Sequence, residues 1–204
     1  MHDNSEHALE NGRSLRRQEL LSLAAKLFAE RGYGSTTVRD IAKAADMLSG
    51  SLYYHFKSKD AIIDEILRAF LDPLFAEYRT AVTADSSPRR MLEALVMASF
   101  RAIAANRWAV EIYQKEGRWL STNPEFSYIK DRNREFREIW MGVFESGLVQ
   151  GWFRSDIDAD QYFRFVRDSV WLSARWFGDD DGEKFREVGR MYLTMILDGL
   201  VIRR

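Results

Sequence analysis

The chain has 204 residues, of which 46% are hydrophobic and 30% are charged, so it is long and apolar enough for a small head and a larger body with a buried core. It contains no cysteine, which excludes disulfides, zinc fingers, iron–sulfur clusters and a cysteine nucleophile. Its net charge of −1 is unevenly distributed, because residues 1–12 carry −3, residues 13–59 carry +5 and the rest carries −3. A compact basic segment suits a nucleic-acid partner, with chance clustering as the alternative.

The sequence shows no targeting or membrane signal. Residues 1–12 are polar and acidic, unlike a signal peptide, and we expect them to be a disordered tail. No stretch approaches the roughly 18 apolar residues of a membrane helix. We therefore expect a cytoplasmic protein with no membrane partner.

Apolar spacing is helical nearly throughout the chain. A first helix is predicted from about Leu15 to Arg31, with an apolar stripe, and Gly32 ends it. Two short helices follow over 38–45, after Thr36 and Thr37, and over 49–56, capped by Ser49. A long helix capped by Ser58 is predicted over 59–81, with Pro73 as a candidate bend.

Five more helices are predicted over roughly 88–105, 107–120, 125–150, 158–177 and 182–202. Pro88 suits a first helical turn, and Gly151 and the segment 178–182 are breaks. We predict an all-α protein of about nine helices, with a tail over 1–12, a three-helix helix-turn-helix head over 13–58 and a helical bundle over 59–204.

The strongest functional signal lies in residues 37–56. Apolar residues would face inward from two short helices, and they are Val38, Ile41, Ala42, Ala45, Leu52 and Phe56. This pattern is typical of a helix-turn-helix, whose second helix enters the major groove of DNA.

The candidate DNA contacts share polar groups that can bond to phosphates or base edges. On and after the second helix they are Ser49, Ser51, Tyr53, Tyr54, His55, Lys57 and Lys59. For Tyr53, a place in the core explains the residue equally well. Arg16 and Arg17 could lie over the minor groove or the backbone. Thr36, Thr37 and Arg39 stand at a helix N-terminus, where backbone N–H groups favour a phosphate.

Three motifs in residues 15–60 resemble the head of the TetR family of transcriptional repressors. They are Ala-Lys-Leu-Phe-Ala-Glu-Arg-Gly-Tyr, Thr-Thr-Val-Arg-Asp-Ile-Ala and Gly-Ser-Leu-Tyr-Tyr-His-Phe-Lys-Ser-Lys-Asp. The resemblance implies that Tyr53, Tyr54, His55, Lys57 and Lys59 hold phosphates and that Ser49 and Ser51 read bases. It also implies that the body, 59–204, dimerises and binds a small molecule.

Dimer contacts are expected from the last two helices, and a homodimer would read a palindromic operator. Their wide apolar faces include Leu172, Met191, Tyr192, Met195, Ile196 and Leu200.

The body is rich in large apolar side chains, most of which must be core. Together they could line a cavity for a bulky apolar ligand, and they are Phe70, Phe75, Met97, Phe100, Trp108, Tyr113, Trp140, Phe144, Phe163 and Trp171. Of these, Phe70, Phe100 and Trp140 are our candidates for the ligand site, with Trp171 and Arg167.

In the helix 158–177, Arg164, Arg167, Trp171 and Arg175 recur at spacings of three and four, which places them near one another. We expect this helix to be largely buried, and buried arginines need anionic partners. Three partners for these arginines remain open: Asp168 within the chain, a phosphate-bearing ligand, and an intersubunit salt-bridge network.

Three body motifs resemble one actinobacterial subgroup of TetR repressors, which controls degradation of the C and D rings of cholesterol. They are Phe126-Ser-Tyr-Ile-Lys-Asp-Arg-Asn, Arg167-Asp-Ser-Val-Trp and Ala174-Arg-Trp. The resemblance implies a coenzyme A thioester of a two-ring steroid remnant as effector, no cofactor, and Arg167 and Trp171 as the leading ligand residues.

Two other functions remain open at this point. One is a TetR-type regulator of a different hydrophobic ligand, and the other is an all-α acyl-CoA enzyme. The enzyme has little support, because the only histidines are His2, His7 and His55 and no phosphate-binding glycine loop occurs. A membrane-surface protein is disfavoured, because the basic segment coincides with the helix-turn-helix.

Overall fold

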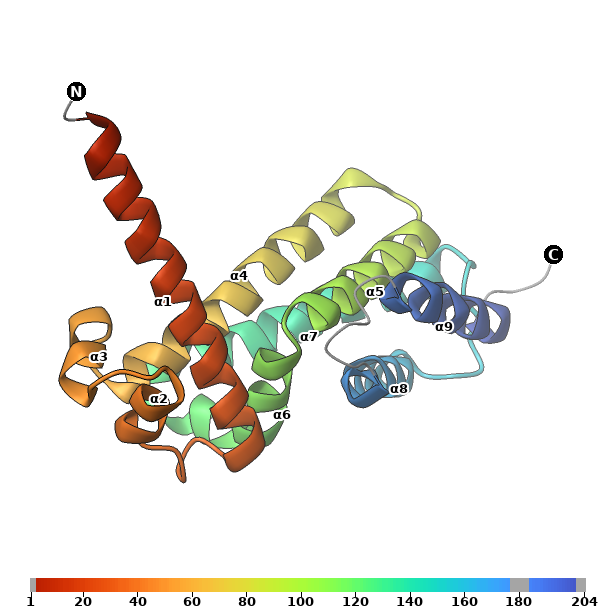
Figure 1. The fold of residues 1–204 in the computed structure, drawn as a ribbon. Helices are drawn as coiled ribbons and strands as arrows, with labels where there is room; N and C mark the ends of the chain where they lie inside the picture. The colour runs from red at the N-terminus through yellow and green to blue at the C-terminus, as the bar shows by residue number, and fades with distance from the viewer. Residues whose placement is uncertain (1–2, 177–183, 201–204) are drawn as a thin grey trace.

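The structure is a computed structural model that describes the backbone of residues 3–176 and 184–200 and the side chains of residues 14–176 and 184–199. These residues form an all-α fold, as predicted (Figure 1). The helices are α1 (Asp3–Arg31), α2 (Val38–Ala44), α3 (Ser49–His55), α4 (Lys59–Ala84), α5 (Pro88–Ala105), α6 (Arg107–Thr122), η1 (Pro124–Phe126), α7 (Ser127–Val149), α8 (Ala159–Leu172), η2 (Ser173–Trp176) and α9 (Lys184–Leu200). None of the helices described could span a bilayer.

The head consists of α1, α2 and α3, and local sequence signals set its boundaries. Gly32 ends α1 with a φ of 87°, in the left-handed region that glycine adopts without strain. Thr37 caps α2 in a reciprocal capping box with Asp40. Leu52 and Phe56 anchor α3 in the core, with 1% and 4% exposure, as predicted.

The long helix α4 leads from the head into the bundle (Figure 1). The Ser58 hydroxyl accepts a hydrogen bond from the backbone N–H of Ala61 and so begins the helix as predicted. The helix continues through Pro73 to Ala84. Its buried face includes Phe70 and Phe75, so α4 forms one wall of a pocket in the bundle.

The bundle surrounds α5, whose buried face packs against α4, α7 and α9. Between α4 and α5, the Tyr78 and Ser99 hydroxyls share a buried hydrogen bond of 2.5 Å. Figure 1 shows α8 and α9 at the end of the molecule away from α2 and α3. This end of the bundle is therefore remote from the two short helices of the head.

Two details differ from the sequence predictions. Residues 3–12 are helical and belong to α1, where a disordered tail was expected. Leu48, with extended backbone, holds the N-cap position of α3 in place of Ser49, and no side chain caps the helix. The predicted break at 178–182 and residues 201–202 lie outside the described residues.

Candidate functional site

The outer face of α3 exposes the predicted polar and aromatic side chains. Tyr54 is 94% exposed and Tyr53 is 57% exposed, which favours the contact interpretation of Tyr53 over the core one. Ser51 is exposed, and Ser49 and His55 are partly exposed. The head thus presents hydroxyl and imidazole groups on one short helix, with its apolar side chains beneath.

Thr37, Arg39 and Lys57 extend this surface, and all three are exposed. The Thr37 hydroxyl donates to Asp40 at 2.6 Å, so its side chain also serves the cap of α2. This hydrogen bond and that of the Thr37 backbone hold the pKa of Asp40 below its usual range.

Two predicted contacts have structural roles instead. Thr36 is 0% exposed, and its hydroxyl donates to the carbonyl of Gly32 at 2.9 Å, so it cannot reach DNA. The ammonium of Lys59 donates to the carbonyls of Tyr33 and Thr36 at 2.9 and 3.0 Å. Lys59 therefore fixes the loop after α1, where carbonyl groups lack helical partners.

Arg16 and Arg17 also hold the head together. Arg16 donates to the carbonyl of Ala45 at 2.8 Å, at the end of α2. Arg17 forms a two-pronged ion pair with Glu65 of α4, donates to the carbonyl of His55, and lies 4.3 Å from the Phe56 ring. Arg16 thus holds the end of α2 against α1, and Arg17 holds the end of α3 and the start of α4 against α1.

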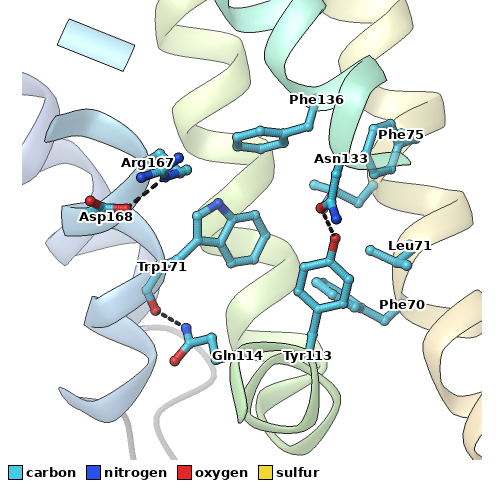
Figure 2. A pocket seen from close by; sticks show the side chains of 11 residues that line it. Phe70, Leu71, Phe75, Tyr113, Gln114, Asn133, Phe136, Arg167, Asp168 and Trp171 are labelled. Atoms are coloured by element: carbon cyan, nitrogen blue, oxygen red, sulfur yellow. Dashed lines mark hydrogen bonds and ion pairs between the residues drawn. The ribbon is translucent and has the colours of Figure 1, made fainter. Parts of the chain in front are cut away.

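A mostly apolar pocket of about 220 Å³ lies in the body between α4, α6, α7 and α8 (Figure 2). Its apolar wall includes Phe70, Leu71, Leu74, Phe75, Phe136 and Trp171. The Trp171 ring meets Phe70 edge to face, with centroids 6.0 Å apart, and contacts Phe136 at 6.2 Å. Such walls suit a compact ring system.

Polar groups also border the pocket. On α8, Arg167 Nε donates to Asp168 at 2.7 Å. On α6, Gln114 donates to the carbonyl of Trp171 at 2.6 Å, and Tyr113 donates to Asn133 of α7 at 2.5 Å. Burial raises the pKa of Tyr113 to about 12, so its hydroxyl keeps its proton at neutral pH.

Three of the five predicted ligand residues, Phe70, Arg167 and Trp171, line this pocket. Phe100 and Trp140 do not. Phe100 is fully buried against Tyr192, with ring centroids 5.5 Å apart. Trp140 is 1% exposed among other aromatic rings of the core. Apolar spacing marks a buried face, but it does not indicate which buried face borders a cavity.

The arginines of the predicted helix 158–177, which lie on α8 and η2, are less buried than the sequence predicted. Arg164 and Arg175 are exposed, and Arg167 is intermediate. Arg164 and Arg137 both bind Asp160, at 2.6 and 2.7 Å. Of the three predicted arginines, only Arg167 lines the pocket.

Helix α6 connects the pocket to the head, which the sequence analysis did not foresee. One turn beyond Tyr113, the Glu116 carboxylate accepts from the backbone N–H of Tyr33 at 3.1 Å. Lys115 donates to the carbonyl of Ala29 in the last turn of α1. The sequence analysis also did not identify Asn133 and Gln114 as pocket residues, because a polar side chain on an amphipathic helix is expected to face solvent.

Comparison with known proteins identifies the family. Residues 20–66 match the model of bacterial regulatory proteins of the tetR family, and residues 85–200 match the tetracyclin repressor-like C-terminal domain. The chain belongs to the TetR family. It is a transcription regulator of that family and not an acyl-CoA enzyme. The family binds operator DNA and responds to small-molecule effectors.

Similar TetR proteins include repressors from two actinobacteria. The chain is 53% identical over 190 residues to the HTH-type transcriptional repressor KstR2 of Rhodococcus jostii, covering 93% of each chain. It is 49% identical over 185 residues to KstR2 of Mycobacterium tuberculosis, covering 91% of this chain and 92% of the relative. The solved structure of ketosteroid transcriptional regulator KstR2 of M. tuberculosis superposes with a TM-score of 0.87 at 48% identity, over 92% of this chain and 96% of that one.

Proposed function

We propose that this protein is a homodimeric repressor that binds a palindromic operator through α3 and is released by a coenzyme A thioester of a steroid-derived ring system. The observation that carries the proposal is the apolar pocket edged by Arg167 and Trp171, because two of its walls, α4 and α6, also contact the head. The similar M. tuberculosis protein is described as a ketosteroid transcriptional regulator, which supports the ligand class.

The size of the pocket restricts how such a ligand would bind. Its volume of about 220 Å³ is smaller than that of pockets that enclose whole drug-sized ligands. A compact ring system would fit against Trp171, and the nucleotide would lie outside. The Arg167 side chain is 41% exposed, and it is its Nε that donates to Asp168. Its two terminal nitrogens can therefore reach a phosphate at the rim of the pocket.

For operator recognition, we assign base contacts to Ser49 and Ser51. Phosphate contacts are assigned to the exposed groups Thr37, Arg39, Tyr53, Tyr54, His55 and Lys57. In a homodimer two copies of α3 would lie about one DNA turn apart, roughly 34–36 Å. The protein would act in the cytoplasm, where its operator lies.

The proposed dimer joins α8 and α9 of two copies. Large apolar side chains that are exposed in the single chain gather on this part, and they are Phe165, Leu172, Trp176, Met191 and Met195. A dimer interface here would bury these side chains, which form an apolar surface that monomeric proteins seldom expose to water. Tyr192 and Ile196 are partly buried within the chain, and the Leu200 side chain lies outside the described residues.

Coupling between ligand and DNA would pass through α4 and α6. Helix α4 carries both Glu65, bound to Arg17 of the head, and Phe70 of the pocket. Helix α6 carries Tyr113 of the pocket and Glu116 at the head. A ligand that shifts either helix would weaken DNA binding, and DNA would weaken ligand binding by the same factor.

A gel-shift titration tests the proposal, using the operator and a bicyclic steroid-derived acyl-CoA. We expect release of DNA by the wild type, and unchanged retention at saturating ligand would contradict the effector. Arg167→Met should retain DNA binding and lose the response. Arg164→Met is the matched control on the same helix, because Arg164 lies outside the pocket.

A neutral hydrophobic ligand is the second candidate. The pairing of Arg167 with Asp168 favours it, because the charge of Arg167 already has a partner. The free bicyclic ketone, without coenzyme A, distinguishes the two candidates. If the ketone releases the operator as well as the thioester does, the anionic tail is not recognised.

A further inference from the structure

Tyr113 and Asn133 form an isolated polar pair on the wall of the apolar pocket. Tyr113 comes from α6 and Asn133 from α7, and Figure 2 shows their side chains pointing toward one another. The Tyr113 hydroxyl donates to Asn133 Oδ1 at 2.5 Å. Since burial raises the pKa of Tyr113 to about 12, the pair is neutral at physiological pH.

The pair retains hydrogen-bonding capacity that the fold does not use. A primary amide has two N–H donors besides its oxygen. Among the residues whose side chains are described, no acceptor bonds to Asn133 Nδ2. Asn133 is exposed, so water can satisfy these donors. A ligand that displaces this water must bring an acceptor of its own, or the donors lose their partners.

The pair suits a neutral acceptor, because an anion gains more from a charged donor than from an uncharged amide. Asn133 offers N–H donors without a positive charge, whereas the cation of the pocket is Arg167 on α8. In Figure 2, Trp171 lies between Arg167 and the Tyr113–Asn133 pair. A ligand with its ring system against Trp171 would therefore meet the cation on one side and the neutral donors on the other.

We propose that Tyr113 and Asn133 form a subsite for a neutral hydrogen-bond acceptor, such as a carbonyl oxygen, on the ring system of the effector. The subsite rests on the proposed function, in which this pocket holds the effector. It separates two specificities, because Arg167 recognises the anionic tail and the Tyr113–Asn133 pair recognises the oxidation state of the ring.

The test uses two matched probes on the protein of 204 residues. One is a coenzyme A thioester of a bicyclic acid with a ring ketone, and the other carries a methylene in place of that carbonyl. Their dissociation constants are measured by calorimetry for the wild type, Asn133→Leu and Tyr113→Phe. The ratio of the two constants is the readout, because general damage to the fold affects both probes alike.

We expect the wild type to bind the ketone about three- to tenfold more tightly than the methylene probe, as one neutral hydrogen bond allows. Asn133→Leu should bring the ratio close to one, whatever its effect on the affinity for the methylene probe. Tyr113→Phe should reduce the preference for the ketone only in part, since it removes the hydroxyl bound to Asn133 Oδ1 and leaves the amide N–H donors in place. Equal wild-type affinities, or a ratio unchanged in Asn133→Leu, would overturn the subsite. If neither thioester binds, the effector proposal falls as well.

Discussion

The indole ring of Trp119 stacks on the phenol ring of Tyr33, with centroids 4.9 Å apart and planes inclined by 29°. Tyr33 follows α1, and Trp119 lies on α6 beyond the pocket residue Tyr113. The Tyr33 hydroxyl also donates to Asp60 at 2.5 Å, and Lys59 lies 4.1 Å from its ring. Burial and Asp60 raise the pKa of Tyr33. This tyrosine thus connects the head to both α4 and α6.

Trp119→Ala should weaken communication between pocket and head, because it removes the aromatic contact between α6 and Tyr33. Operator affinity is measured with and without saturating effector, and we expect their ratio to fall by about fivefold, at the lower end of allosteric couplings. Trp152→Ala is the control, since Trp152 is similarly exposed, at 42%, and lies after α7. Equal ratios in Trp119→Ala and wild type would show that this contact transmits nothing.

Lys57→Met should weaken binding to every operator sequence, because an exposed lysine on a phosphate releases a counterion. The slope of log affinity against log salt should become shallower by about one per subunit. Lys59→Met should leave this slope unchanged and lower the melting temperature, since its ammonium bonds to two loop carbonyls. The reverse pattern would show that Lys59 is the phosphate contact.

Gly147→Ala should destabilise the body, because a Cβ there would lie 2.0 Å from Cδ2 of the buried Phe153 ring. Overpacking of this kind costs about 1–3 kcal/mol in the free energy of unfolding, measured with urea. Gly142→Ala on the same helix meets nothing within 4 Å and should be neutral or stabilising by up to about 1 kcal/mol. Similar effects of the two substitutions would contradict the close approach of Phe153.

Asp160 of α8 should contribute stability that depends on pH. Hydrogen bonds from Arg137 of α7 and Arg164 hold the pKa of Asp160 below its usual range. The contribution is therefore fully present above the unfolded pKa of about 4, and it is lost as the pH falls through the lower folded pKa. Urea midpoints of wild type and Asp160→Asn should differ at pH 6 and converge toward pH 3. A constant difference would show that ionisation of Asp160 is not involved.

Short-range chemistry explains why the sequence predicted the head and the helix boundaries well. The capping box of Thr37 and Asp40 and the cap of Ser58 depend on residues three positions apart, so the chain order alone specifies them. The apolar spacing that buries Leu52 and Phe56 is equally local. Ser49 shows the limit of such signals, since the turn places Leu48 at the cap position.

Which side chains border the pocket was decided only by the tertiary structure. Phe70 and Phe100 are both buried aromatics, and only Phe70 faces the space between α4, α6, α7 and α8. The pairing of Tyr113 with Asn133 and the capture of Lys59 by loop carbonyls join positions far apart in the chain. The sequence determined the helices and their apolar faces through local hydrogen bonding and periodicity. The rotation and distance between packed helices depend on all their contacts together, and these decided the site.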